Sequence, residues 1–413
     1  MKDLTREGIF VFPEGIDDVE DIDGNQMILW SENANFCTGN IVGFLGYKQE
    51  RLTICSRFSS DNCDYFFQYM LERVLNLPNI MNFNIDTNKE NEIYQLLIFL
   101  FPYYLKKALR KGIYRTYIRR KYNDNNLKGS VDIPRHIKHN IPFTGYIAYN
   151  QREISYDNDL MELIRHTIEF ILKKPFGNQL LRAINDEINI VIEVTPSYNF
   201  LDRGKLLYRN KTKPIQHAYF HEYRALQRLS IMILQQERHQ VGVGRDFFQG
   251  ILFDCSWFWE EYINLLIQDY FYHPINKAGK GKQDLFSKSF SPYQKVGWIY
   301  PDFISKKESK EIGDAKYKPF ENINSKDYLQ ILAYMYRFKA KKGYFLYPES
   351  HVDKKYDLYL NSGSTFDNNV QPREDIIVKK HGLKIPMSAK CYESFVDEIK
   401  QSEKEFLLEF NEL

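Results

Sequence analysis

The stretch Ile299-Tyr300-Pro301-Asp302-Phe303, together with Glu311-Ile312-Gly313-Asp314-Ala315-Lys316-Tyr317 after it, decides the fold of this chain. Both stretches are rich in β-branched and aromatic residues, as strands are, and the first continues that pattern over residues 296–304. The polar residues 305–310 between them are typical of a turn. The sequence therefore predicts an antiparallel hairpin that closes around Glu308.

This hairpin brings three charged side chains together. Its closing point is the midpoint between Asp302 and Asp314, so the two carboxylates are expected to lie roughly opposite each other. Asp314 and Lys316 share one face of their strand, because side chains alternate, and Ala315 points the other way. Two carboxylates this close destabilise each other unless a cation or a shared proton compensates. The arrangement therefore indicates function rather than stability.

Composition limits the classes of protein that remain. The chain has 413 residues, enough for two or three domains with real cores. A formal net charge of +2 excludes a strongly basic protein that coats nucleic acid, so any affinity for a polyanion must come from local patches. The five cysteines are scattered and form no Cys-x-x-Cys pair, which argues against a zinc site and for a reducing cytoplasm. Because no signal peptide or membrane-length apolar run is evident, we expect a soluble cytoplasmic protein.

The rest of the chain mixes strands with helices. Short strands are expected at residues 8–12, 27–30, 41–46 and 51–55, and the region 356–387 is expected to be rich in strands. Helices are expected at residues 64–75, 92–111, 157–172, 219–236, 255–272 and 394–410. Residues 276–292, rich in glycine and lysine, are expected to form a connecting loop. The predicted fold class is therefore α+β or α/β with several domains.

Two helices flank the hairpin and complete a motif. The helix before it is strongly apolar yet carries Glu260 and Glu261, and a buried acid is costly unless it is paired. The helix after it is expected to begin with Ser325 as its cap and to end near Gly343. On that helix Gln330, Tyr334 and Arg337 fall on one face. The order of helix with Glu, strand with Pro-Asp, strand with Asp-x-Lys and helix with Gln is the layout of the PD-(D/E)xK nuclease core.

The residue types suit metal-dependent phosphodiester hydrolysis. Mg²⁺ takes hard oxygen ligands and keeps several waters, so Asp302 and Asp314 with a scissile phosphate suffice to hold it, and Mn²⁺ is an expected substitute. Lys316 would support the attacking water. Glu260, favoured over Glu261 because it follows the aromatic Trp259, and Gln330 would complete the site. The competing interpretation is a surface hairpin whose charges pair with one another.

A basic run between residues 106 and 128 is the most one-sided charge in the chain, with tyrosines interleaved. Such a run can follow a phosphate backbone, and it can equally be a solvated helix face followed by a charged strand. Both interpretations stay open. The candidate DNA contacts are Arg115, Arg119, Arg120, Lys121, Tyr334 and Arg337.

These motifs resemble the McrC family, the nuclease subunits of 5-methylcytosine-specific (McrBC-type) restriction systems. The resemblance covers most of the chain and is most specific in the nuclease segment, at Pro301-Asp302, Asp314-Ala315-Lys316-Tyr317 and Asp327-Tyr328-Leu329-Gln330-Ile331-Leu332-Ala333-Tyr334. Further matches are Gly43-Phe44-Leu45-Gly46, Leu52-Thr53-Ile54, Arg57-Phe58, Lys128-Gly129-Ser130-Val131-Asp132 and Tyr156-Asp157-Asn158-Asp159.

The resemblance implies a Mg²⁺-dependent DNA endonuclease subunit with little activity alone. Its partner would be a McrB-like AAA+ GTPase hexamer, which binds the GTP and acts on double-stranded DNA, and whose GTP hydrolysis this chain would stimulate. The chain itself has no Gly-x-x-x-x-Gly-Lys-Ser/Thr loop, in agreement with that division of labour. A requirement for methylated DNA does not follow, because McrC-like subunits also serve systems that cut unmethylated sites.

Three segments are expected along the chain. Residues 1–130 form a β-rich and helical partner-binding region, residues 131–240 form a mainly helical middle region, and residues 241–413 form a PD-(D/E)xK nuclease domain with a mixed sheet flanked by helices. Two other functions remain alternatives: a non-catalytic adaptor that activates a ring NTPase, and a repair nuclease of the same type that acts alone.

Overall fold

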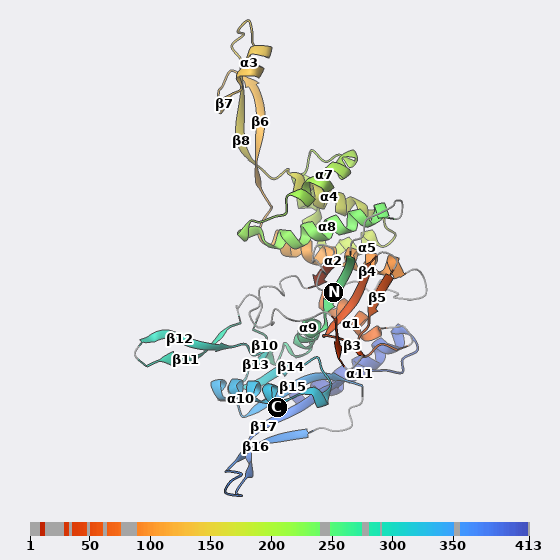
Figure 1. The fold of residues 1–413 in the computed structure, drawn as a ribbon, viewed down its shortest axis with the longest axis vertical. Helices are drawn as coiled ribbons and strands as arrows, with labels where there is room; N and C mark the ends of the chain where they lie inside the picture. Colours follow the sequence, from red (N-terminus) through yellow and green to blue (C-terminus); the bar gives the residue numbers. More distant parts are fainter. Residues whose placement is uncertain are drawn as a thin grey trace. The chain divides into compact units, whose positions relative to one another are not determined.

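The computed structural model describes residues 9–12, 29–32, 35–47, 50–60, 64–75, 89–239, 248–274, 281–289, 291–350 and 356–411. It is a mixed α+β structure of more than one domain, which confirms the predicted class (Figure 1). By packing, the chain forms two compact units: residues 1–89 with 245–413 make the first, and residues 90–244 make the second. The expected division into three segments stays a prediction.

The first unit is built on a six-stranded mixed sheet. Its strands, in spatial order, are β10 (Phe271–Tyr272), β13 (Phe303–Ser305), β14 (Glu311–Ala315), β15 (Lys342–Glu349), β17 (Gln371–Lys384) and β16 (Tyr356–Ser362). The strands β14, β15 and β17 run parallel, and the pairs β10–β13, β13–β14 and β16–β17 are antiparallel. The strand-rich region expected over residues 356–387 is confirmed.

The predicted hairpin is present with its predicted register. Phe303 pairs with Gly313 and Ile304 pairs with Ile312, so β13 and β14 close around Glu308. Continuing this register by one step places Asp302 opposite Asp314. The two carboxylates therefore lie opposite each other, because Asp302 and Asp314 are equally far along the sequence from Glu308 in the turn.

The first strand of that hairpin is shorter than predicted. Residues 296–304 do not form one strand, because the pairing with β14 begins only at Phe303. Pro301 has no N–H to offer a ladder, and a proline also restricts the residue before it. Upstream of this break, β12 (Ser291–Ile299) pairs instead with β11 (Gln283–Lys288) in a separate two-stranded ribbon.

The expected connecting loop at residues 276–292 is largely this ribbon, so that expectation is wrong for residues 283–288 and 291–292. Residues 276–280 and 290 lie outside the described part of the chain. Glycine and lysine lower strand propensity in general, yet β11 pairs with β12, and its Leu285 packs against the core.

Three helices pack against the six-stranded sheet and its surroundings. They are α9 (Cys255–Ile267), α10 (Ser325–Phe338) and α11 (Tyr392–Asn411). In α9 the side chains of Phe258, Trp259 and Tyr262 are fully buried, as its composition predicted. The expected extension of this helix to residue 272 is wrong, because residues 271–272 form β10. The helix expected at 394–410 is confirmed as α11.

Helix α10 begins and ends differently from expectation. Its cap is Asn324 rather than Ser325: the Asn324 side chain accepts from the Lys326 backbone N–H, and Asp327 accepts from the Asn324 N–H. The helix ends at Phe338 because Lys339 adopts a left-handed conformation with φ 56°. Gly343, the expected end, belongs to β15.

The N-terminal strands also belong to the first unit. A four-stranded sheet has the order β1 (Ile9–Phe12), β9 (Phe248–Asp254), β4 (Ile41–Tyr47), β5 (Glu50–Ile54), and β2 (Leu29–Glu32) forms a hairpin with β3 (Asn35–Thr38). The expected strands are confirmed where described; residues 8 and 27–28 lie outside the described part. Gly43 faces β9 closely, since a Cβ there would lie 2.1 Å from the Ile251 carbonyl oxygen. Helix α1 (Tyr65–Leu75) packs on α9.

The second unit combines a helical bundle with a β-ribbon. Its helices are α2 (Lys89–Leu109), α4 (Asp159–Leu172), α5 (Gly177–Leu181), α6 (Asn185–Val194), α7 (Arg203–Thr212) and α8 (Glu222–His239). The ribbon pairs β8 (Ile147–Ser155) with β6 (Thr116–Asp124) and with β7 (Ser130–Val131), carries α3 (Ile133–His139) at its end, and extends away from the bundle (Figure 1). The basic run therefore covers the end of α2 and the strand β6. Among the described residues, no helix is both long and apolar enough to cross a membrane.

Candidate active site

Helix α9, strand β15 and the residue that follows β14 meet at one backbone carbonyl. The oxygen of Leu346 accepts the Lys316 backbone N–H at 2.8 Å and the Trp259 indole N–H at 3.0 Å. The buried indole thus holds the strand end that carries Lys316 against its parallel neighbour. Beside it, the Ala315 N–H donates to Asp302 Oδ2 at 2.8 Å. The strand backbone therefore fixes where the first carboxylate lies.

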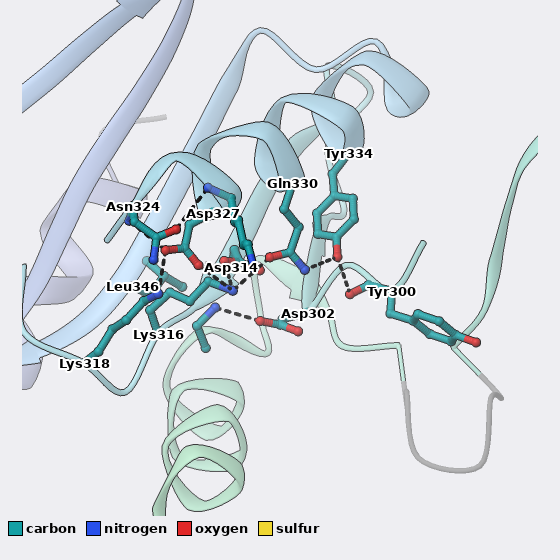
Figure 2. A network of polar contacts seen from close by, with 12 residues as sticks. Tyr300, Asp302, Asp314, Lys316, Lys318, Asn324, Asp327, Gln330, Tyr334 and Leu346 are labelled. Carbon is teal, nitrogen blue, oxygen red and sulfur yellow. Dashed lines mark hydrogen bonds and ion pairs between the residues drawn. The ribbon is translucent and has the colours of Figure 1, made fainter. Parts of the chain in front are cut away.

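Asp314 and Lys316 form the centre of the site, as the alternation of the strand predicted (Figure 2). Lys316 Nζ lies 2.7 Å from Asp314 Oδ2 and also donates to Gln330 Oε1 at 3.1 Å. Asp314 is 1% exposed, whereas Asp302 and the Lys316 side chain are partly exposed. One buried carboxylate and two accessible polar groups therefore face the same point.

Burial and mutual repulsion act on these carboxyls. Burial raises the pKa of Asp302, and the charges of Glu260 and Asp314 raise it further. Burial also raises the pKa of Asp314, although Lys316 opposes that shift. Burial lowers the pKa of Lys316, but Asp314 and Asp302 outweigh it, so the net shift is upward and the amine stays charged. The site holds more negative charge than one lysine neutralises.

Glu260 adds a third acid to this environment. Its side chain is 26% exposed, and burial, with the charges of Glu261 and Asp314, raises its pKa to about 7 against the opposing effect of His273. Its charge also raises the pKa of Asp302. This supports the preference for Glu260 over Glu261, which stays a prediction.

His273 was missed by the sequence analysis. Its Nδ1–H donates to the Asp302 backbone oxygen at 2.8 Å, and its Nε2 lies 3.7 Å from Glu260 Oε1 and 3.9 Å from Glu261 Oε1. Burial lowers the pKa of His273, but the neighbouring acids raise it more. The imidazole thus joins the helix acids to the Pro-Asp segment. A lone histidine after β10 gave no signal, because only the fold brings it to Asp302.

The predicted face of α10 is turned toward the hairpin. Gln330 Nε2 donates to the Tyr334 hydroxyl at 2.7 Å, and that hydroxyl donates to the Tyr300 carbonyl at 3.1 Å (Figure 2). Arg337 Nε donates to the Asp284 carbonyl at 2.8 Å, on the ribbon. Tyr334 is buried, so its position is that of a support for Gln330; the DNA contact expected of it stays a prediction, as does that of Arg337.

Asp327 is a further acid near the lysine that the sequence analysis did not single out as a site residue. Its Oδ1 lies 3.8 Å from Lys316 Nζ, and its Oδ2 accepts from Lys318 Nζ at 2.5 Å and from the Asn324 N–H at 2.8 Å. Burial raises the pKa of Asp327, but these donors outweigh it and lower the pKa. The capping position of Asp327 in the first turn of α10 was the signal that could have identified it.

The carboxylates fit a hard divalent cation. Asp314 Oδ2 is buried, and beyond its ion pair with Lys316 no donor meets it in hydrogen-bond geometry. Among the described residues, no group of three or more His, Cys, Asp and Glu side chains has the geometry of a metal site. Asp302 and Asp314 are the candidate ligands of Mg²⁺, an ion that favours a few carboxylate oxygens completed by water and substrate oxygens.

The basic residues predicted to contact DNA belong to the second unit. Arg119, Arg120 and Lys121 lie on β6, and Arg115 directly precedes it. Arg120 Nε lies 3.7 Å from Glu153 Oε2, so part of this charge is neutralised across the ribbon. Their role in DNA binding stays a prediction.

Two solved structures are similar to this chain. One is a half-complex of Thermococcus gammatolerans McrB AAA+ hexamers with bound McrC: identity is 14%, 91% of this chain and 85% of that chain are covered, and the TM-score is 0.40. The other is the McrBC complex of the same organism, with 16% identity, 62% and 74% coverage and a TM-score of 0.29. No curated protein matches the chain.

The family of the chain follows from its sequence match. A family model for components of the McrBC 5-methylcytosine restriction system matches residues 37–348. This range covers well over half of the chain and contains Asp302, Asp314, Lys316, Glu260 and Gln330. The chain therefore belongs to the family of McrBC 5-methylcytosine restriction system components.

Proposed function

We propose that this chain is the nuclease subunit of a McrBC-type restriction system and cuts DNA phosphodiesters with Mg²⁺. One observation carries the proposal: Asp302, Asp314 and Lys316 converge from the two strands of one hairpin, with Gln330 on the following helix bonded to the lysine. The succession of α9, β13, β14 and α10 around a mixed sheet supports a PD-(D/E)xK core.

Each side chain has a distinct task in this proposal. Asp302 and Asp314 would hold Mg²⁺, which when bound stabilises charge on the phosphate and activates water. Lys316 orients the attacking water and adds positive charge beside the phosphate, and Gln330 keeps the amine in place through its 3.1 Å contact. Glu260, whose pKa is about 7, can hold or release a proton near neutral pH.

Assembly with a ring GTPase is part of the proposal. The family is that of restriction-system components, and a similar solved structure contains McrC bound to McrB AAA+ hexamers. The sequence carries no P-loop of its own, so GTP hydrolysis would come from the partner. We therefore expect cleavage to require the partner, GTP and Mg²⁺ together.

The test is a cleavage assay on double-stranded DNA with the partner GTPase, GTP and Mg²⁺. Wild type should cut the DNA. Asp314→Ala should lower the cleavage rate at least a hundredfold, because it removes one of the two proposed ligands of Mg²⁺. GTPase stimulation measured on the same samples should be retained. Glu308→Gln, in the exposed turn of the same hairpin, is the matched control and should cut like wild type.

The other functions predict different results in this assay. Unchanged cleavage by Asp314→Ala would refute the catalytic assignment. A complex that hydrolyses GTP but never cuts DNA would identify the chain as an adaptor. Efficient cutting by the chain alone, without partner or GTP, would identify an independent repair nuclease.

A further inference from the structure

The ribbon β11–β12 presents one face to solvent. Phe286 pairs with Val296 and Asp284 pairs with Trp298, and directly opposite residues point to the same face. On this face Phe286 is 64% exposed and Trp298 is 49% exposed. The opposite face at the base of the ribbon carries Leu285 and Ile299, which pack with the core of the first unit. One face therefore anchors the ribbon, and the other carries exposed aromatic side chains.

Positive charge accompanies the aromatic residues. Lys282 Nζ lies 3.8 Å from the centre of the Trp298 ring, which holds the ammonium over the indole. Lys288, at the end of β11, is exposed as well. Lys295 is also exposed, but on the opposite face, because it pairs with Ser287 and its Nζ donates to the Ser287 hydroxyl at 3.1 Å. Residues 281–299 contain these three lysines against Asp284 alone, a formal charge of +2. Exposed aromatic rings beside lysines can bind duplex DNA, because the lysines neutralise phosphates and the rings offer apolar contacts to base edges in the groove.

The ribbon is also held next to the nuclease site. Its strand β12 leads through Tyr300 and Pro301 directly to Asp302. Trp298 precedes Asp302 by four residues, and a chain of that length spans at most about 14 Å. Measured along the axis of a DNA duplex, that length corresponds to about four successive phosphates of one strand. Arg337, on the face of α10 that carries Gln330, clamps the base of the ribbon through the Asp284 carbonyl.

We propose that the face of Phe286, Trp298 and Lys282, with Lys288 at the end of β11, binds double-stranded DNA and holds it beside the hairpin of Asp302 and Asp314. A two-stranded ribbon is narrow enough to enter the major groove of DNA, which is about 12 Å wide. The surface is positively charged as well as apolar, and this favours DNA over an apolar protein partner. The inference rests on the proposed function, because it assigns a contact to the same substrate.

Binding of a fluorescein-labelled DNA duplex, followed by fluorescence anisotropy in EDTA, tests this surface without cleavage. The full-length chain is measured alone and with the partner GTPase. The double variant Phe286→Ala/Trp298→Ala should bind about tenfold more weakly. Lys282→Gln/Lys288→Gln should also bind more weakly and should reduce the slope of log affinity against log salt by about two. Phe366→Ala, at a 99% exposed position on the turn after β16, is the matched control and should bind like wild type.

Circular dichroism melting of every variant shows whether the chain is folded, and a folded ribbon variant with wild-type affinity would overturn the inference. Equal weakening by Phe366→Ala would overturn it too, because the effect would not belong to the ribbon. Cleavage assays separate this result from the proposed function. Ribbon variants that lose DNA binding while the wild-type complex never cuts would support the surface and refute the nuclease. If the complex cuts DNA equally well with wild type and with the ribbon variants, the result would support the nuclease and refute the DNA-binding role of the ribbon face.

Discussion

At the scale of the residue, the site brings together carboxylates whose mutual repulsion does not stabilise the folded chain. The pKa values of Asp302, Asp314 and Glu260 are all raised, chiefly by burial. A group in that position favours its neutral form, and a divalent cation relieves the same repulsion. The stability of the metal-free chain should therefore depend on the protonation of these acids.

Glu260 gives this dependence a direction. Its pKa is about 7 in the folded chain against an ordinary value of 4.5. The stabilisation from its proton is fully present below pH 4.5 and is lost as the pH rises through 7. In EDTA, the melting temperature of wild type should fall between pH 5.5 and pH 8 by more than that of Glu260→Gln. An equal fall in both proteins would show that Glu260 does not carry the effect.

Gln330 should act through Lys316. Gln330→Ala removes the 3.1 Å contact to the Lys316 amine while leaving both aspartates in place. We expect cleavage in the assembled complex to slow about tenfold to a hundredfold, with little change in melting temperature. Tyr334→Phe, which removes the hydroxyl that Gln330 and Tyr300 share, should slow it less. Wild-type rates in both variants would contradict this role.

At the scale of the element, the local sequence predicts the hairpin but not the residue at which its first strand begins. The symmetry of Asp302 and Asp314 about Glu308 fixed the register, because strand pairing depends only on counting from the turn. The sequence does not predict the break at Pro301, because the strand-like composition of residues 296–304 outweighs the one missing N–H. The sequence also does not show that α9 ends at Ile267, because Phe271 suits a buried helix and a strand equally.

The ribbon of the second unit invites a test of partner binding. Ile133 and Ile137 on α3, with Ile141 and Phe143 after it, are all exposed, and clustered exposed apolar residues mark interaction sites. We expect Ile137→Ser/Phe143→Ser to reduce stimulation of the partner GTPase at least tenfold while the chain remains folded. Leu201→Ser, at an exposed apolar position outside the ribbon, is the control. Equal stimulation by the two variants would locate the contact elsewhere.

At the scale of the whole molecule, contacts distant in sequence join the N-terminal strands to the sheet of the site. Arg57 donates to the Pro348 carbonyl at 2.7 Å and lies over the rings of Phe58 and Tyr317, and Tyr317 directly follows Lys316. The hydroxyls of Tyr69 and Tyr262 both donate to Glu403. No periodicity in the sequence predicts such pairs. The strand β9, which inserts between β1 and β4, was missed for the same reason.

Arg57→Ala tests this long-range packing. It leaves the Pro348 carbonyl without its donor and removes the cation from two rings, so the free energy of unfolding should fall by about 1–3 kcal/mol. Urea denaturation measures it. Arg373→Ala, whose exposed guanidinium pairs with the nearby Asp375, should leave the free energy of unfolding close to that of wild type. A loss no greater than that control would mean that the contact does not stabilise the unit.

The central claim is that Asp302 and Asp314 hold the divalent ion that hydrolyses DNA. The most direct measurement is the rate of DNA cleavage by the complex with its GTPase partner as Mg²⁺ is titrated, for wild type, Asp302→Asn and Glu308→Gln. Asparagine can still accept the Ala315 N–H, so the variant removes charge and retains the hairpin. Wild type and Glu308→Gln should show a rate that rises with Mg²⁺ and saturates, and Asp302→Asn should stay at background throughout. Cleavage by Asp302→Asn at the wild-type rate and Mg²⁺ dependence would contradict the claim.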